Sequence, residues 1–127
     1  MKLLVTGGAG FIGSHFINYW IKNHPDDNLI NLDNLTYAGS LVNLSQVIDS
    51  PKYEFVKGDI SDMPLVEKIM SNVDTVVHFA AETHVDRSIM DPWPFIQSNL
   101  VGTYTLLEVA KRYEIKHFHH VSTDEVF

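Results

Sequence analysis

Three glycines at intervals of three residues, Gly7, Gly10 and Gly13, lie in the stretch VTGGAGFIG (residues 5–13) near the start of the chain. Gly8, together with the last two, also gives the spacing Gly-x-Gly-x-x-Gly. Because glycine has no side chain, a pyrophosphate can come close to the backbone here, and the N-terminus of a following helix offers it N–H groups and positive potential. From this stretch alone, a plain turn between a strand and a helix stays open as the alternative.

Asp33 is the second residue suited to such a ligand. It ends an apolar run (residues 29–32) and follows Gly13 by 20 residues. From this position an acidic side chain accepts hydrogen bonds from the adenosine ribose of a dinucleotide, which disfavours the alternative of a simple capping residue. Asn34 comes next, and no Arg or Lys lies nearby to hold a 2′-phosphate, so the sequence predicts NAD rather than NADP.

Two neighbouring carboxyl groups, Asp124 and Glu125, follow Thr123 in the last stretch, VSTDEVF. Two carboxyl groups whose environments separate their pKa values can serve as general acid and general base. An isolated Asp-Glu pair is more often a solvated surface feature, because acidic side chains are mostly exposed. This pair comes after the last expected strand, at the edge where an open parallel sheet binds its ligand, and that position favours catalysis.

Short apolar runs that alternate with helical patterns must position these residues. The expected strands are 2–6, 29–33, 53–57, 75–79 and 117–122, and the expected helices are 11–23, 64–70 and 94–113. A short helix is also expected within residues 34–50, and Ser61 is the expected N-cap of the helix at 64–70, with Asp62 in its first turn. This alternation predicts an α/β fold with a doubly wound, Rossmann-like parallel sheet in the order 3-2-1-4-5.

Composition and charge exclude several classes of partner. The net charge is −7 without a block of like charges, which argues against nucleic acid because phosphate contacts need clustered Lys and Arg. There is no cysteine, hence no disulfide and no thiolate metal site. No apolar run is long enough for a signal peptide or a membrane span, so we expect a cytoplasmic protein without a membrane partner.

The histidines near the end of the chain do not predict a metal site. On a strand, His117 and His119 share one face while His120 points to the other. No carboxylate or thiolate stands at a supporting spacing, and we expect no metal. His78 lies inside an apolar strand and is expected to be a hydrogen-bonded core residue.

Six segments resemble the extended short-chain dehydrogenase/reductase family, and within it the nucleotide-sugar 4,6-dehydratases. They are GGAGFIG, NLDNLTYAG, KGDI, HFAAETHVDRS, NLVGTYTLLE and VSTDEVF, and together they extend over essentially the whole chain. Several are shared with nucleotide-sugar epimerases and decarboxylases, whereas Thr-Asp-Glu belongs to the dehydratases. The resemblance implies NAD-dependent dehydration of a nucleotide-activated glucose, expected to be dTDP-glucose, with UDP left open as the alternative nucleotide. Hydride leaves carbon 4 for NAD, water is lost across carbons 5 and 6, and hydride returns to carbon 6.

The resemblance also implies roles for single positions. The implied NAD contacts are Gly7, Gly10, Phe11, Ile12, Gly13, Asp33, Asn34, Leu35, Thr36, Asp59, Ile60, Ala80, Ala81, Glu82, Thr83, Ser98 and Asn99. Thr83, His84 and Thr123 are implied to contact the substrate, with Thr123 on the carbon 4 oxygen. Asp124 is implied to be the acid and Glu125 the base of the elimination. The helix at 94–113 is implied to pack against a second subunit in a homodimer.

The family oxidises carbon 4 with a Tyr-x-x-x-Lys pair on a helix, and the one such spacing here, Tyr53 and Lys57, does not fit. In the expected strand, four residues span roughly 13 Å, too far for the lysine to lower the pKa of the tyrosine. In the family the pair follows Thr-Asp-Glu. Residues 1–127 are therefore interpreted as an incomplete NAD-binding domain that lacks the remaining strands and the C-terminal substrate region, and the chain alone is expected to be inactive.

Two alternatives stay open. A non-catalytic NAD-binding module would share the glycine stretch and Asp33 but would have no need of an acid–base pair. A nucleotide-sugar 4-epimerase would need no acid and base for elimination, so replacement of Asp124 or Glu125 should barely affect it.

Overall fold

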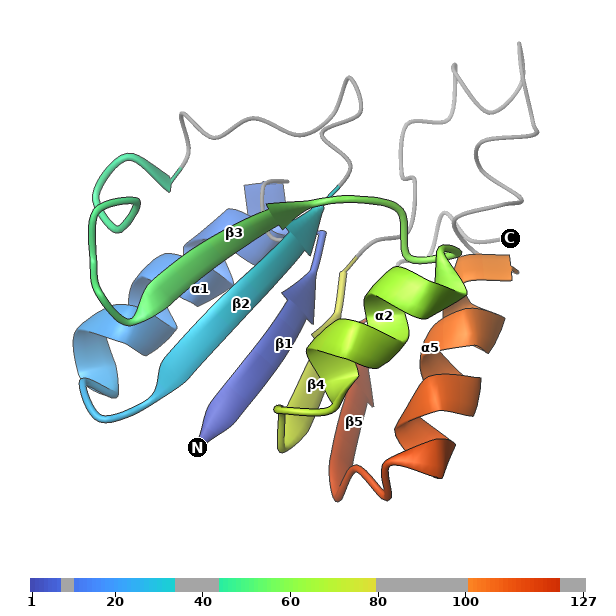
Figure 1. Cartoon of the computed structure of the whole chain (residues 1–127). Helices are drawn as coiled ribbons and strands as arrows, with labels where there is room; N and C mark the ends of the chain where they lie inside the picture. Colours follow the sequence, from blue (N-terminus) through green and yellow to red (C-terminus); the bar gives the residue numbers. More distant parts are fainter. Residues whose placement is uncertain (8–10, 34–43, 80–100, 122–127) are drawn as a thin grey trace, which may run out of the picture.

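The structure is a computed structural model, and it describes residues 1–7, 11–33, 44–79 and 101–121 (Figure 1). Within this part of the chain, five parallel strands form one sheet in the order β3-β2-β1-β4-β5. The strands are β1 (Lys2–Thr6), β2 (Asn28–Asp33), β3 (Tyr53–Lys57), β4 (Thr75–His78) and β5 (His117–His120). The predicted sheet order is confirmed, and the strand ends differ from the prediction by no more than two residues. Ser122, the last residue of the fifth predicted strand, lies outside the described residues.

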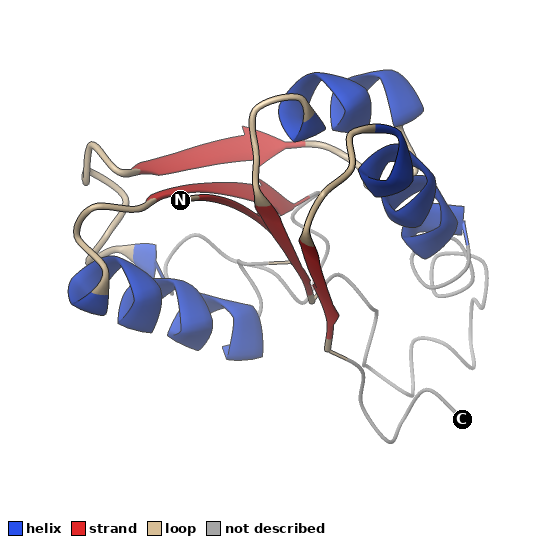
Figure 2. Cartoon of the chain, turned by 90° about the horizontal axis from the view of Figure 1, so that it is seen from below, coloured by secondary structure: helices blue, strands red, loops and turns tan. Residues whose placement is uncertain are grey.

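Helices cover both faces of the sheet, as Figure 2 shows. Helix α1 (Phe11–Asn23) lies on one face, and α2 (Met63–Met70) and α5 (Gly102–Arg112) lie side by side on the other. The bounds of α1 agree with the prediction. Helix α5 is the later part of the helix predicted at 94–113, whose residues 94–100 lie outside the described residues.

The central strands are apolar on both sides because each face packs against a helix layer. Successive side chains of a strand point to opposite faces, so Leu3 and Val5 join the core on the α1 side while Leu4 joins the core under α2 and α5. All three are at most 1% exposed. Val76 and Val77 divide β4 between the two cores in the same way.

The N-cap of α2 was predicted wrongly. The helix begins at Met63, one residue earlier than expected, and Asp62 rather than Ser61 is its cap. The Asp62 carboxylate accepts a hydrogen bond from the Leu65 N–H at 3.3 Å. Ser61 instead belongs to the turn that follows β3, where its N–H and its hydroxyl both donate to Asp59 Oδ1, each at 2.8 Å.

The short helix expected within residues 34–50 is only partly inside the described region, which resumes at Leu44. Residues 44–49 form tight turns rather than a regular helix, with the N–H groups of Val47 and Ile48 both donating to the Leu44 carbonyl at 3.0 Å. Leu44 is fully buried against the α1 side of the sheet. Among the described helices, none has the length and apolar character needed to cross a membrane.

Candidate functional site

The carboxyl ends of the strands meet at one edge of the sheet (Figure 1). In the parallel register, Thr6 at the end of β1 pairs with Leu32 on one side and with His78 on the other, and His78 pairs with His120. The chain moves from β1 toward β2 and β3 on one side, and then crosses to β4 and β5 on the other. The strand order therefore reverses at β1, and doubly wound sheets bind their ligands at such a reversal.

Gly7 makes the turn that leaves β1 at this edge. Its φ angle is 74°, in the left-handed region that side-chain-bearing residues rarely adopt, which explains why glycine is needed at this position. Its N–H donates to the carbonyl of Leu32 at 3.1 Å. Helix α1 begins at Phe11, so its N-terminus lies at the same edge, with Ile12 54% exposed and Gly13 buried in the first turn.

Asp33 ends β2 directly beside this turn, because the Gly7 N–H bonds the carbonyl of Leu32, the residue that precedes Asp33. The residue is only 8% exposed. Its own carbonyl accepts the Gly58 N–H at 3.2 Å, which fixes the end of β2 against the end of β3. The structure thus brings together two of the features predicted from sequence, the glycine turn and the acidic residue at the end of the second strand.

Asp59 and Ile60 follow β3 at the same edge of the sheet. Asp59 Oδ1 accepts two hydrogen bonds from Ser61, so this carboxylate shapes the turn between β3 and α2. Ile60 is 6% exposed and packs in the core under α2 and α5. Their predicted contact with the adenine of a cofactor stays a prediction.

His78 ends β4 and is fully buried, with hydrogen bonds at both ring nitrogens. Nδ1 lies 2.6 Å from the Thr6 hydroxyl, and Nε2 lies 2.9 Å from the hydroxyl of Thr103 in the first turn of α5. The His120 ring stacks on it, with centroids 4.8 Å apart. Burial, with a smaller contribution from His120, lowers the pKa of His78 to about 4, so the imidazole is neutral near pH 7. The expectation of a hydrogen-bonded core histidine is confirmed.

Tyr53 and Lys57 lie at the two ends of β3, which confirms the strand on which their rejection as a catalytic pair rests. The Tyr53 hydroxyl accepts a hydrogen bond from Asn31 Nδ2 at 3.1 Å. Burial raises the pKa of Tyr53; the Asn31 hydrogen bond lowers it less, and the charge of Asp33 adds a smaller increase. A phenol whose pKa is raised holds its proton more firmly, which is the opposite of what a base needs.

Many of the predicted site residues lie outside the described residues, and their roles stay predictions. These are Gly10, Asn34, Leu35, Thr36, Ala80, Ala81, Glu82, Thr83, His84, Ser98, Asn99, Thr123, Asp124 and Glu125. Sequence reasoning did not single out Thr6 and Thr103. The available signal was a threonine at the end of the first strand and another in a helix rich in apolar residues, which is too common a pattern to be informative.

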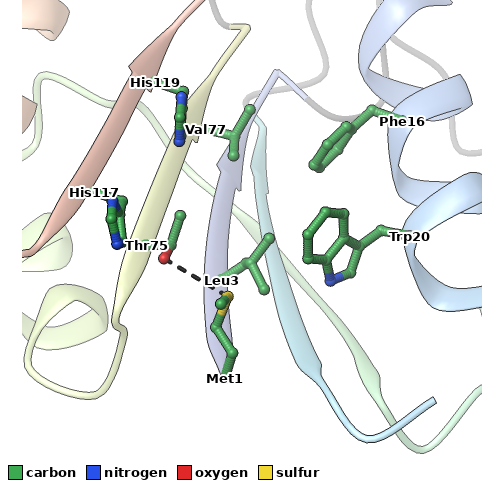
Figure 3. Close-up of a pocket in the computed structure, with 8 residues that line it drawn as sticks. All are labelled: Met1, Leu3, Phe16, Trp20, Thr75, Val77, His117 and His119. Atoms are coloured by element: carbon green, nitrogen blue, oxygen red, sulfur yellow. Dashed lines mark hydrogen bonds between the residues drawn. The ribbon is translucent and has the colours of Figure 1, made fainter. Parts of the chain in front are cut away.

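A hollow of about 630 Å³ lies on the α1 side of the sheet, away from the carboxyl edge (Figure 3). Its lining residues are Met1, Leu3, Phe16, Trp20, Thr75, Val77, His117 and His119. None of them is a predicted site residue. Figure 3 shows both histidines on one side of it, and their stacked rings confirm that they share a face of β5. Within the described ranges, no three His, Asp or Glu side chains are grouped as metal ligands would be.

Three features define a doubly wound, Rossmann-like domain. They are the reversal of strand order at β1, the left-handed glycine turn after it, and the buried acidic residue at the end of β2. The family model described as GDP-mannose 4,6 dehydratase matches residues 4–127, so the chain belongs to this family. This confirms the resemblance to nucleotide-sugar 4,6-dehydratases.

Individual relatives agree with this assignment. A dTDP-glucose 4,6-dehydratase from Actinoplanes is 52% identical over the whole of this chain and 41% of its own length. One from Mycobacterium tuberculosis (strain H37Rv) is 49% identical, over the whole of this chain and 38% of its own length. The chain therefore spans about 40% of the length of these relatives.

Solved structures show the same fold. A dTDP-glucose 4,6-dehydratase from Streptomyces venezuelae, solved with NAD bound, has a TM-score of 0.91 and 50% identity over 97% of this chain and 39% of its own. A UDP-glucose 4-epimerase from Thermotoga maritima, solved with UDP-glucose, has a TM-score of 0.84 and 36% identity over 97% of this chain and 38% of its own.

Proposed function

We propose that this chain is the cofactor-binding part of an NAD-dependent nucleotide-sugar 4,6-dehydratase that acts on dTDP-glucose. The observation that carries the proposal is the hydrogen bond from the Gly7 N–H to the Leu32 carbonyl, which holds the glycine turn beside the acidic residue Asp33. Relatives that are about 50% identical over the whole chain are dTDP-glucose 4,6-dehydratases, and one of that class was solved with NAD.

The described residues fit NAD in three respects. At Gly7 the positive φ turns the backbone at the edge of the sheet, and the N-terminus of α1 presents N–H groups there to a pyrophosphate. Asp33 offers a carboxylate that can accept hydrogen bonds from both ribose hydroxyls. Bound in this place, NAD supplies an acceptor for the hydride of carbon 4 and the donor that returns it to carbon 6.

The chemistry of the elimination falls to Thr123, Asp124 and Glu125. Thr123 donates a hydrogen bond to the carbon 4 oxygen. Glu125 takes the proton of carbon 5, and Asp124 protonates the hydroxyl that leaves carbon 6, so the two carboxyl groups begin the step in opposite protonation states. In the sequence the three residues follow shortly after β5, and β5 ends at the carboxyl edge of the sheet, which supports this assignment.

We further propose that the protein is cytoplasmic and forms a homodimer through the helix at 94–113. The described part of this helix supports an interface, because Val101, Tyr104 and Leu107 are 42%, 62% and 49% exposed at intervals of three residues. Large apolar side chains gathered on one exposed helix face are typical of a protein–protein contact.

The first experiment is a calorimetric titration of NAD into the chain and into the Asp33→Asn variant. Loss of the charged acceptor should weaken binding roughly ten- to a hundredfold, because hydrogen bonds to a charged group contribute about 1.5–3 kcal/mol. Asp26→Asn is the matched control, since Asp26 is exposed in the turn before β2 and should leave the affinity unchanged. Equal affinity in the wild type and in Asp33→Asn would refute the cofactor site.

A second experiment separates dehydration from epimerisation, the reaction of the epimerase with a similar fold. In a protein with the complete substrate region, Asp124→Asn should abolish formation of the 4-keto-6-deoxy sugar. An epimerase would tolerate the same change. The isolated 127 residues are expected to form no product, and turnover by this chain alone would contradict that expectation.

A further inference from the structure

Three segments that lead to predicted cofactor contacts meet at one buried imidazole. We propose that His78 is a positioning residue. Its side chain links the end of β1 to the first turn of α5 and so holds in place the strand and helix ends that border the predicted cofactor site. This inference rests on the proposed function, because it gives the residue a role in holding NAD-binding segments. His78 itself need not touch the cofactor.

The geometry shows why a side chain is needed for this link. Backbone pairing already joins β1 to β4, since the Phe79 N–H donates to the Thr6 carbonyl at 2.8 Å. Helix α5 lies outside that ladder of hydrogen bonds. The 2.9 Å contact from His78 Nε2 to the Thr103 hydroxyl anchors its first turn to the end of the sheet, while Nδ1 holds Thr6 at 2.6 Å.

Neutral histidine suits this position for a chemical reason. A neutral imidazole carries one donor and one acceptor nitrogen, and a threonine hydroxyl can take either role. Thr6 and Thr103 can therefore satisfy both nitrogens in either tautomer. A charged imidazole would have to be held in a fully buried place, which is costly without a counter-charge.

The consequence for the site follows from what lies next to each partner. Gly7, with its left-handed turn, comes directly after Thr6. Ala80 comes two residues after His78, and Ser98 and Asn99 come shortly before Thr103. One side chain thus links the described ends of β1, β4 and α5, from which the predicted cofactor contacts continue along the chain. Its loss should loosen these three ends relative to one another without deleting any contact with NAD.

The test compares His78→Gln with the control His119→Gln, which changes an exposed histidine of β5 that lines the hollow on the α1 side of the sheet. NAD affinity of His78→Gln should fall about tenfold, because the loosened segments must then be ordered when NAD binds. Affinity of the control should stay within about twofold of the wild type. Affinity is measured in buffer where circular dichroism shows each variant folded, so a purely structural role would leave it unchanged.

Amide hydrogen exchange gives a readout that does not need NAD. In His78→Gln, exchange should become faster at Gly7 and in the first turn of α5, while α2 keeps its protection. If the wild type fails to bind NAD, the proposed function fails, and this exchange pattern alone decides the role of His78. If NAD affinity and the exchange pattern both match the wild type, the proposal is overturned.

A second variant covers the case in which His78→Gln does not fold. Thr103→Val keeps the buried imidazole and removes only its link to α5. It should reproduce the loss of NAD affinity and the faster exchange at the start of α5. Combined with Thr6→Val, it should lower affinity by no more than His78→Gln does, because all three changes break one chain of contacts. A folded Thr103→Val with wild-type affinity and exchange would also overturn the proposal.

Discussion

Acid should weaken the folded state through His78, and the size of this effect follows from its surroundings. Burial is the main cause that lowers its pKa from 6.5 to about 4 in the folded chain. Between these two values the unfolded chain binds a proton at this imidazole that the folded chain does not bind. The free energy of unfolding therefore rises with pH, by about 1.4 kcal/mol per unit.

Over the whole window the effect amounts to about 3 kcal/mol. This stability is fully present above pH 6.5 and is lost as the pH falls toward 4. A loss of this size is large for a small domain, whose total stability is typically about 5–15 kcal/mol.

The assay is urea unfolding followed by circular dichroism at several pH values from 7 down to 4.5, for the wild type and for His78→Gln. Carboxylates titrate in both proteins, so their contribution cancels in the difference. The lost hydrogen bonds of the variant lower its free energy of unfolding by a constant amount. The missing imidazole removes the part of the pH dependence that comes from His78. The difference in free energy of unfolding between the wild type and His78→Gln should therefore shrink steadily as the pH falls. The His119→Gln control should show the same pH dependence as the wild type.

Parallel curves for the wild type and His78→Gln would refute the reasoning. They would mean that His78 titrates alike in the folded and the unfolded chain. The imidazole would then have to be open to water rather than enclosed by Thr6, Thr103 and His120.

Three further changes test the local structure by urea unfolding. Asp62→Ala removes the cap of α2 and should cost about 1 kcal/mol, clearly more than Ser61→Ala; the reverse order would contradict the cap assignment. Arg112→Ala breaks the ion pair to Glu67, which joins α5 to α2, and a longer one to Glu108 within α5. It should cost less than about 1 kcal/mol because these side chains are substantially exposed, and a larger loss would show a contribution beyond the two ion pairs. Gly7→Ala places a side chain at a φ of 74° and should cost about 1 kcal/mol or more, so an unchanged midpoint would argue against the left-handed turn.

The order of the elements was predictable because each apolar run ends at a residue that stops it. Glycine follows β1, and a proline after His24 follows α1, so both bounds of that helix could be read from the sequence. The cap of α2 could not, since Ser61 and Asp62 are both good capping residues. Which of them caps depends on the turn after β3, where Asp59 holds Ser61.

Some features of the candidate site could likewise be predicted from the sequence, and others could not. Gly7 and Asp33 were predictable because each stands directly at the end of a strand, and parallel strands bring those ends to one edge. That His78 would be buried and hydrogen-bonded was also predictable, but its partners were not. Thr103 reaches it only because α5 packs over the end of β4, and no local pattern encodes the position of that helix.

The order of the strands in the sheet has a consequence for how the protein is made. β1 is synthesised before the other four described strands, yet it lies at the centre of the sheet, and the hydrogen bond from Thr6 in β1 to His78 in β4 joins residues 72 positions apart. A ribosome adding about 5–20 residues per second would need roughly 4 to 14 seconds to reach β4 after β1. During that time β1 can pair with β2, but its other edge is open to strands of neighbouring nascent chains. Factors that shield emerging polypeptide should therefore raise the yield of folded protein most when they act before residue 78 has left the ribosome.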